Sequence, residues 1–249
     1  MAPVLAMTRS IGGLFGRGVC AGTLILILGF LAFKAGKEGL SNFYAQSAHM
    51  EIERWSKPGQ SFRGDEGTRV MQYLGSSLYH SPNNPWPLEV MGTLQLRGMS
   101  AAKEPQLAVA AARSAKVNFR LALAQRPTSP FAWASLARTK LYLGEQDEEL
   151  FRAIERAEEL GPWEPEVQQS VVFIGLTLWN RLNPAQQATV VRAMDRGARR
   201  NPGKIAEIAK TFDRIDLFCA LSYSSTSQGR EVCNPISKSG SAKKRERQQ

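Results

Sequence analysis

The sequence has little of what most catalytic and metal sites are built from. Only two histidines, His49 and His80, occur in the 249 residues, and neither has a partner at metal-ligand spacing. No H-E-x-x-H, G-x-S-x-G, phosphate-loop or C-x2-C pattern is present. We therefore predict a protein that is not an enzyme and that uses no cofactor or metal. Both histidines are interpreted as ordinary interfacial or capping residues.

Cysteine is also scarce, with Cys20, Cys219 and Cys233 alone. A bond between the last two would close a loop of about 15 residues, which stabilises a fold by roughly 3 kcal/mol in the chain-entropy model. Such a bond requires an oxidising compartment. Two free thiols are the alternative, and the sequence leaves both open.

Runs of β-branched residues are few, whereas alanine, leucine, glutamine, glutamate and arginine are plentiful. This mixture favours helices, and we predict an all-α fold. The net charge of +10 indicates attraction to anionic surfaces and polymers, but it carries no information about the fold.

One uncharged apolar run stands near the N-terminus, GVCAGTLILILGFLAF at 18–33. With the small residues that follow, it barely reaches the roughly 20 residues that span a bilayer. We interpret 11–36 as an uncleaved transmembrane anchor. A cleaved signal peptide is the rival reading, but no clean small-x-small site follows the run. Gly18 and Gly22 have a spacing that lets membrane helices pack together, although such helices tolerate glycine in general.

The flanking charges bear on the orientation of this anchor. Arg9 and Arg17 precede the run, and Lys34 and Lys37 follow it. With the free amino group, this is a weak positive-inside bias that keeps the N-terminal tail in the cytoplasm. The body of the protein would then be extracytoplasmic, in the periplasm of a Gram-negative cell.

A repeated pattern of paired prolines occurs in the rest of the chain. The P-x-x-P spacing occurs in SPNNPW, RPTSPF and GPWEPE. Around the second copy, small and large apolar residues stand at the distances that define the end of one tetratricopeptide repeat and the start of the next. We predict that the first proline ends a helix and the second opens the next one. The predicted packing residues are Ala115, Phe119, Ala122, Pro127, Trp133, Leu136 and Ala137.

The same apolar, apolar, small, proline order precedes Pro82, Pro162 and Pro202. The intervals between the four prolines are 45, 35 and 40 residues, whereas a strict tetratricopeptide array keeps 34. We predict a degenerate tetratricopeptide-like α-solenoid of helical hairpins behind a transmembrane helix. An unclassified α-solenoid is the alternative, and a polyproline recognition segment is a further rival for P-x-x-P.

The predicted organisation divides the chain into five parts: an N-terminal tail (1–10), the anchor (11–36), a connecting helix and loop (37–65), the repeat domain (66–221) and a polar basic tail (222–249). The predicted helices are 12–55, 66–80, 85–98, 104–126, 130–143, 146–160, 165–182, 184–200 and 203–221.

Two charged features are candidates for interaction. The segment 145–160 is predicted to be acidic on its outer face. A basic face near a helix C-terminus is formed by Arg192, Arg196, Arg199, Arg200 and Lys204. Such faces are commonly only solvated, but a basic face could also contact an anionic glycan, a lipid headgroup or an acidic partner. Trp86 and Trp163 are the candidate exposed aromatic residues.

Beyond the generic repeat, the chain resembles the VpsP-type polysaccharide biosynthesis proteins of Gram-negative bacteria. The resemblance rests on NNP (83–85), RPxxPxAW (126–133), LGEQDEE (143–149) and LGPWEPEVQ (160–168). It covers about residues 15 to 200.

The resemblance implies a single-pass inner-membrane protein with a periplasmic helical body. Its partners would be proteins of an exopolysaccharide synthesis or export machine, with no nucleic acid among them. The implied role is that of a scaffold acting by protein–protein contact. The alternatives are an adaptor in other envelope assembly or protein export, and a module that binds an anionic glycan directly.

Overall fold

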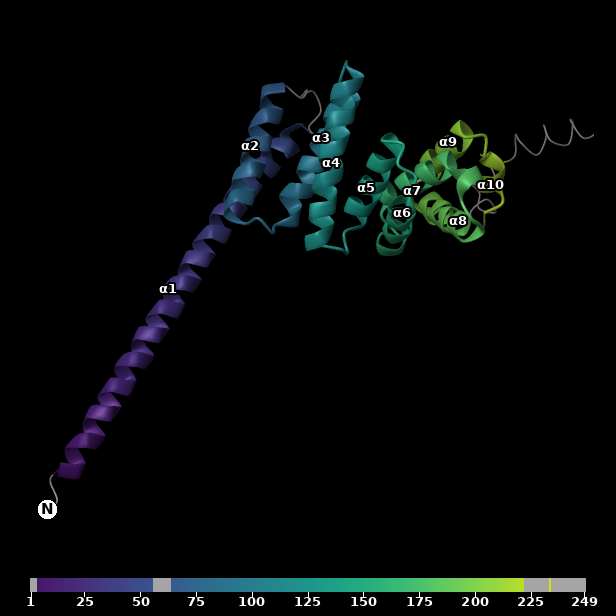
Figure 1. The fold of residues 1–249 in the computed structure, drawn as a ribbon. Helices are drawn as coiled ribbons and strands as arrows, with labels where there is room; N and C mark the ends of the chain where they lie inside the picture. The colour runs from purple at the N-terminus through teal and green to yellow at the C-terminus, as the bar shows by residue number, and fades with distance from the viewer. Residues whose placement is uncertain (1–3, 56–63, 222–232, 234–249) are drawn as a thin grey trace, which may run out of the picture. The chain divides into compact units, whose positions relative to one another are not determined.

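A computed structural model describes residues 4–55, 64–221 and 233, with side chains from residue 22 onward in the first range and from residue 66 in the second. This part of the chain is all-helical and contains no strand, which confirms the all-α part of the predicted fold class (Figure 1). The elements are α1 (Val4–Trp55), α2 (Gly64–His80), α3 (Pro85–Ala101), α4 (Pro105–Gln125), α5 (Pro130–Tyr142), α6 (Glu148–Leu160), α7 (Pro165–Thr177), η1 (Trp179–Arg181), α8 (Pro184–Arg200), α9 (Pro202–Thr211) and α10 (Ile215–Cys219).

The chain forms two compact units that divide between Pro87 and Leu88. The division differs from the predicted domain boundary at residues 65 and 66. It differs because α2 packs on the C-terminal part of α1 and belongs with it. Helix α1 also starts at Val4, within the segment predicted as a tail of ten residues.

In the first unit, α1 and α2 are antiparallel. The hydroxyl groups of Ser41 and Ser77 lie 2.9 Å apart in the buried contact, and the hydroxyl of Ser81 donates to Glu38 over 3.1 Å. Small residues at such contacts let two helices approach closely, and the paired hydroxyls satisfy each other's hydrogen-bonding capacity away from water. The face of α1 toward α2 therefore combines small residues, Ser41 and Ala48, with the ring of Tyr44, which stacks on His80.

The predicted anchor coincides with the N-terminal half of α1. Its residues 11–21 lie outside the part whose side chains are described, so the side chains of the apolar run are described for 22–33. Within the described residues, no helix has both the length and the apolar character that crossing a bilayer requires. In 22–33, residues 24–28, 30, 31 and 33 are large apolar side chains with exposures between 50 % and 76 %.

The second unit builds two layers from successive antiparallel helix pairs. Helices α5, α7 and α9 contact one another in sequence, and α6, α8 and α10 do the same in the other layer. Each first helix also packs against the second helix of its pair, as α5 does with α6 and α7 with α8. One continuous apolar core lies between the layers, so that each pair buries its face against its neighbours.

The joints between helices follow the proline punctuation. Pro130, Pro165, Pro184 and Pro202 each open a helix, where the missing N–H costs no hydrogen bond. The residue before the proline caps the helix in three of these joints, as when the hydroxyl of Ser129 accepts from the backbone N–H of Ala132. P-x-x-P is thus a tight link between two helices.

The last predicted helix, 203–221, is wrong as a single element. Helix α9 ends at Thr211, and α10 begins at Ile215 after a left-handed residue, Asp213, with φ of 53°. The backbone N–H of Arg214 donates to the carbonyl of Ala209 over 2.8 Å, a closure typical of a helix C-terminus with a left-handed residue. Neither glycine nor proline marks the break, so the sequence pattern did not show it.

The predicted helix 165–182 also ends early. Helix α7 stops at Thr177, and a single 3-10 turn, η1, follows. Asn183 must be extended to cap α8, where its side chain and that of Gln186 form a reciprocal capping box. The tighter turn also places Leu178 and Leu182 in the core.

Candidate functional site

A groove of about 820 Å³ runs across one layer of the second unit. It is lined by α3, α5, α7 and α9, which are the first helices of four successive pairs. Each helix contributes residues three or four positions apart, so each turns one face to the groove. The main lining residues are Thr93, Leu96, Arg97, Ser100, Phe131, Ser135, Arg138, Tyr142, Glu166, Ser170, Phe173, Lys204, Glu207 and Thr211.

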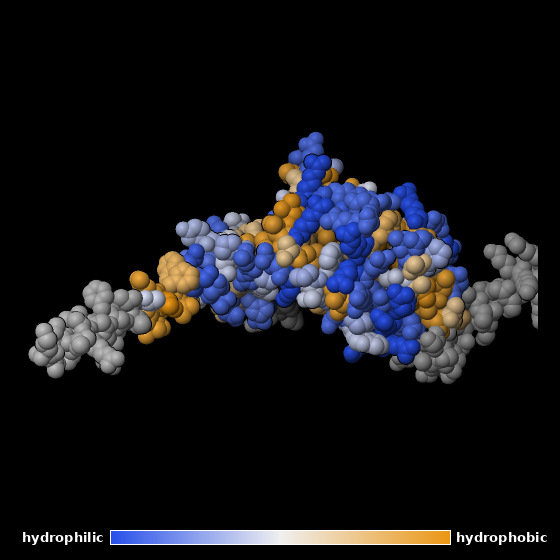
Figure 2. Space-filling model, turned by 60° about the horizontal axis from the view of Figure 1, so that its bottom comes forward, coloured by the Kyte–Doolittle hydropathy of each residue, from blue (hydrophilic) through white to orange (hydrophobic). Residues whose placement is uncertain are grey.

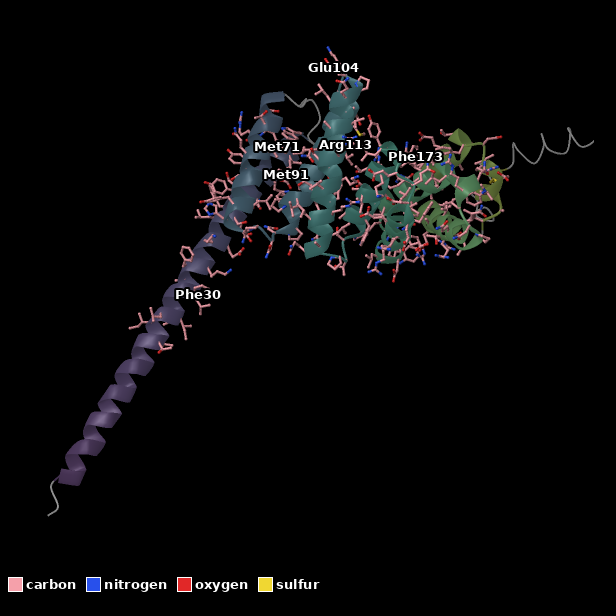
Figure 3. The ribbon with its side chains drawn as sticks, viewed as in Figure 1. Phe30, Met71, Met91, Glu104, Arg113 and Phe173 are labelled. Carbon is pink, nitrogen blue, oxygen red and sulfur yellow. A yellow bond between two sulfur atoms is a disulfide. The ribbon has the colours of Figure 1, made fainter. Side chains whose placement is uncertain are left out.

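Three aromatic side chains of the groove are unusually exposed. Phe131, Tyr142 and Phe173 keep 43 %, 46 % and 42 % of their surface accessible. Phe173 projects from α7 (Figure 3) and contacts Phe212 edge to face, with ring centroids 5.4 Å apart. Fixed aromatic surface is the material from which protein contact sites gain most of their binding energy. The groove therefore offers three aromatic side chains against which a bound protein can pack.

The charges of the groove differ between its two ends. Arg97 on α3 and Arg138 on α5 are exposed, and neither makes an ion pair among the described residues. On α9, Lys204 donates to Glu207 over 2.9 Å, so that pair neutralises itself. The α3–α5 end therefore carries two guanidinium groups that are available to an external carboxylate.

The residues predicted to pack the repeats form the interior behind this groove. Ala115, Phe119, Ala122, Leu136 and Ala137 are buried. Phe119 packs against α3 at Gly92, where an added Cβ would lie 2.8 Å from the ring. The seven-residue prediction thus locates the core that positions the groove.

Trp133 and Pro127 belong to the same packing set but lie near the surface. Trp133 is half-buried, and its indole N–H donates to the carbonyl of Pro127 over 2.8 Å. Pro127 itself is exposed, two residues after α4 ends. This bond ties the start of α5 to the turn that precedes it.

The predicted basic face is largely neutralised. Arg192 and Arg196 both pair with the buried carboxylate of Glu158 on α6, Arg192 at 3.5 Å. Arg199 pairs with Asp195 at 2.9 Å. Lys204 is paired in the groove, and Arg200 is exposed. Sequence spacing on α8 did not show these acidic residues on the neighbouring turn and helix, and an interaction at this face stays a prediction.

The aromatic and histidine candidates have local partners. Trp163 is 53 % exposed, and the guanidinium of Arg196 lies 6.0 Å from its ring centroid. Trp86 contacts His49 edge to face at 5.9 Å, and the imidazole of His80 stacks on Tyr44 at 5.8 Å. These contacts agree with the interpretation of both histidines as interfacial residues.

A buried ionic cluster joins α4, α5 and the turn before α6. The ammonium of Lys140, whose side chain is fully buried, donates to Glu145, Asp147 and Glu149 over 3.1, 2.8 and 2.6 Å. Helix α4 adds Lys116, which pairs with Glu145, and Arg120, which donates to Glu149 over 2.8 Å. Three carboxylates of the segment predicted as an acidic outer face, those of Glu145, Asp147 and Glu149, thus pair with cations of α4 and α5 while staying partly exposed.

The cluster shifts the titration of its members. Hydrogen bonds from Lys116, Lys140 and Arg120 lower the pKa values of Glu145, Asp147 and Glu149 respectively, in each case against the opposing effect of burial. Burial lowers the pKa of Lys140, but hydrogen bonds to the three carboxylates outweigh it and the pKa is raised. All four groups are therefore held in their charged forms over a wider pH range than in the unfolded chain.

A disulfide joins Cys219 and Cys233, the two cysteines for which the sequence left pairing open. Their Cα atoms are 5.7 Å apart, and both residues pack against the core of the second unit. The bond fastens Cys233 to the end of the helical array.

Of the residues that line the groove, only Lys204 was among the predicted site residues. Phe131 lies two residues before Trp133 and Arg138 one residue after Ala137. Because the two are seven residues apart, the helical period alone would have placed them on one face of α5, beside the packing positions. The sequence did not reveal that this face aligns with those of three other helices. That alignment follows from tertiary stacking.

No family model matches the chain. A search of curated proteins also finds no match.

Proposed function

We propose that the protein is a membrane-anchored helical-repeat scaffold that holds components of an exopolysaccharide synthesis or export machine together. It acts by protein–protein contact and not by catalysis. The observation that carries the proposal is the groove, in which the first helices of four helix pairs present exposed aromatic residues together with two arginines that make no ion pair within the described part of the chain. Concave faces of stacked helix pairs are suited to extended contacts.

The anchor is supported by the exposed apolar side chains of α1. They lie on all sides of the helix, with Leu26 and Ile27 exposed at successive positions, and a helix that is apolar all round needs an apolar environment. Figure 2 shows this hydrophobic stretch beside the residues drawn in grey. We propose that residues 11–36 insert in the bacterial inner membrane and that the body is periplasmic, where a disulfide would persist.

The groove further suggests the chemistry of its occupant. Its lining combines aromatic and aliphatic surface with hydroxyl groups, and Arg97 and Arg138 stand at one end. A protein segment that inserts apolar side chains and directs an aspartate or glutamate to these guanidinium groups would match both features. A polysaccharide would fit the aliphatic lining less well, because sugar hydroxyls would be buried there without hydrogen-bond partners.

The proposal can be tested by placing a photoreactive amino acid at Ser135 in the groove of the full-length protein in its native cells. The matched control carries the same group at Arg152, which is exposed on α6 in the other layer. We expect protein adducts from Ser135 alone, formed with membrane or periplasmic components of polysaccharide synthesis. Adducts with other envelope or export proteins would favour the alternative adaptor role, and equal labelling at both positions would contradict docking in the groove.

A direct glycan-binding module is the alternative that the basic face suggested. The stacking of Arg196 on the exposed ring of Trp163 is the observation in its favour. The pairing of Arg192 and Arg196 with Glu158 weakens it, because a glycan carboxylate would have to compete with an internal one. Loss of polymer binding on changing Arg192, Arg196 and Arg199 to alanine would support this alternative.

A further inference from the structure

One side of α1 carries a second apolar pattern that the contact with α2 does not use. Between residues 24 and 33 large apolar side chains are exposed all round the helix, but from residue 37 to residue 55 the exposed ones, Leu40, Phe43 and Met50, all lie on this side, in line with Leu26 and Phe33. The α2 contact lies on the neighbouring face, through Ser41 and Ala48. We name the unused face the α1 seam, and it consists of Gly22, Leu26, Gly29, Phe33, Gly36, Leu40, Phe43, Ser47 and Met50.

The seam has the period of a helix–helix contact. From Gly22 to Met50 its positions alternate by four and three residues, which is the 3.5-residue repeat of a coiled coil, sustained over four heptads. Contact with lipid alone requires no such repeat. Burial against a globular surface follows the 3.6-residue period of a straight helix, which drifts away from this seam.

The seam has small residues in the part proposed to lie in lipid and large apolar residues in the part proposed to lie in water. Gly22, Gly29 and Gly36 recur every seven residues, and an added Cβ at any of them would meet nothing within 4 Å. In lipid, such positions let two backbones approach closely. Beyond Gly36 the seam carries Leu40, Phe43 and Met50, which are the larger residues that drive association where water is present.

We propose that the α1 seam binds the α1 seam of a second copy of this chain, forming a parallel pair of helices. The inference rests on the proposed membrane anchor, because anchored copies share one orientation and present the seam at the same depth. In that parallel register the positions flanking the seam bring Ala32 near Lys37 and Gln46 near Glu51 of the second copy, so no like charges oppose each other.

Cysteine cross-linking of the full-length protein in membranes tests this proposal. In a Cys20→Ala background, single cysteines replace Leu40 or Phe43 on the seam, and Asn42 serves as the matched control because it is exposed one position away. Mild oxidation should yield several-fold more disulfide-linked dimer at Leu40→Cys and Phe43→Cys than at Asn42→Cys. Equal yields at all three positions, or no dimer at the seam positions, would overturn the proposal.

A second variant separates the seam from the anchor. Gly29→Leu in the Phe43→Cys protein should lower the yield of cross-linked dimer several-fold. The chain should still stay in the membrane when the membranes are extracted with alkaline carbonate. Retained cross-linking would contradict close backbone approach at the seam. If carbonate extracts every variant, the proposed membrane anchor is contradicted and the seam proposal fails with it. That result does not bear on the proposed binding of a partner in the groove.

Discussion

At the scale of single residues, the buried ammonium of Lys140 is the most consequential charge in the described chain. It organises three carboxylates that the sequence presents as a simple acidic run. These carboxylates keep between 29 % and 54 % exposure, so water screens part of their attraction. The cluster nevertheless fixes the turn between α5 and α6, and with it the position of α5 in the groove.

Replacing Lys140 by methionine should destabilise the fold by about 3 kcal/mol, the lower end of the range for breaking a buried ion pair. Lys204→Met removes an exposed pair and should cost about 0–1 kcal/mol. Denaturant unfolding of the detergent-solubilised protein measures both. Equal effects of the two changes would show that the cluster is not a special support.

The same cluster predicts the direction of the acid response. The pKa values of Glu145, Asp147 and Glu149 are lowered in the fold, so their contribution is present above their unfolded values, near 4, and is lost as the pH falls through the folded ones. The stability difference between the native protein and Lys140→Met should therefore shrink between pH 5 and strongly acidic pH, by about half or more. A difference that stays constant over that range would contradict the assignment.

At the scale of helices, the close approach of paired helices depends on small residues at a few positions. Gly175 on α7 is the tightest, since an added Cβ would lie 2.2 Å from a methyl carbon of Val190 on α8. At Gly98 on α3, by contrast, an added Cβ would meet no atom within 4 Å. The two glycines therefore form a matched pair within the same layer.

Gly175→Ala should cost about 1–3 kcal/mol, because overpacking displaces α8 from α7. Gly98→Ala should instead stabilise α3 by roughly 0.5–1 kcal/mol, because alanine is the better helix former. Thermal unfolding of the two variants side by side checks the opposite signs. If both changes are neutral, the proposed contact between α7 and α8 does not limit the packing.

The disulfide at the end of the array is a further element-scale support. Cys233→Ser should lower stability by about 3 kcal/mol, the value for a closed loop of this size. Reductant added to the native protein should reproduce the effect and should leave the variant unchanged. Proteolysis near α9 and α10 should speed up in parallel, and unchanged cleavage would show that the bond does not hold this end.

Helix positions were largely predictable from the sequence because prolines mark most joints. Pro130, Pro165 and Pro184 open helices where they were expected. The break at Asp213 was not predicted, because its left-handed turn is carried by an ordinary residue and closed by backbone bonds. The groove was only partly predictable, because it requires faces of four helices to align in space.

At the scale of the whole molecule, the proposed anchor, the α1 seam and the groove have three different proposed roles. We propose that the anchor holds the chain at the membrane, that the seam brings two copies together and that the groove binds a partner. Two grooves held in one assembly would bind a multivalent partner with higher avidity than either alone. The seam shares residues 22–36 with the proposed anchor, whereas the groove lies in α3, α5, α7 and α9 and can be changed separately.

The central claim is that the groove binds a protein segment with apolar and acidic side chains. Selection of random peptides on the purified full-length protein tests it most directly, with Phe173→Glu and Arg138→Glu as groove variants and Arg152→Glu as the control in the other layer. We predict enriched peptides that carry an aspartate or glutamate beside aromatic or aliphatic residues. Both groove variants should weaken their binding about tenfold or more, as for loss of a buried anchor or charged contact, and Arg152→Glu should not. Peptides that bind all four proteins equally would contradict the claim.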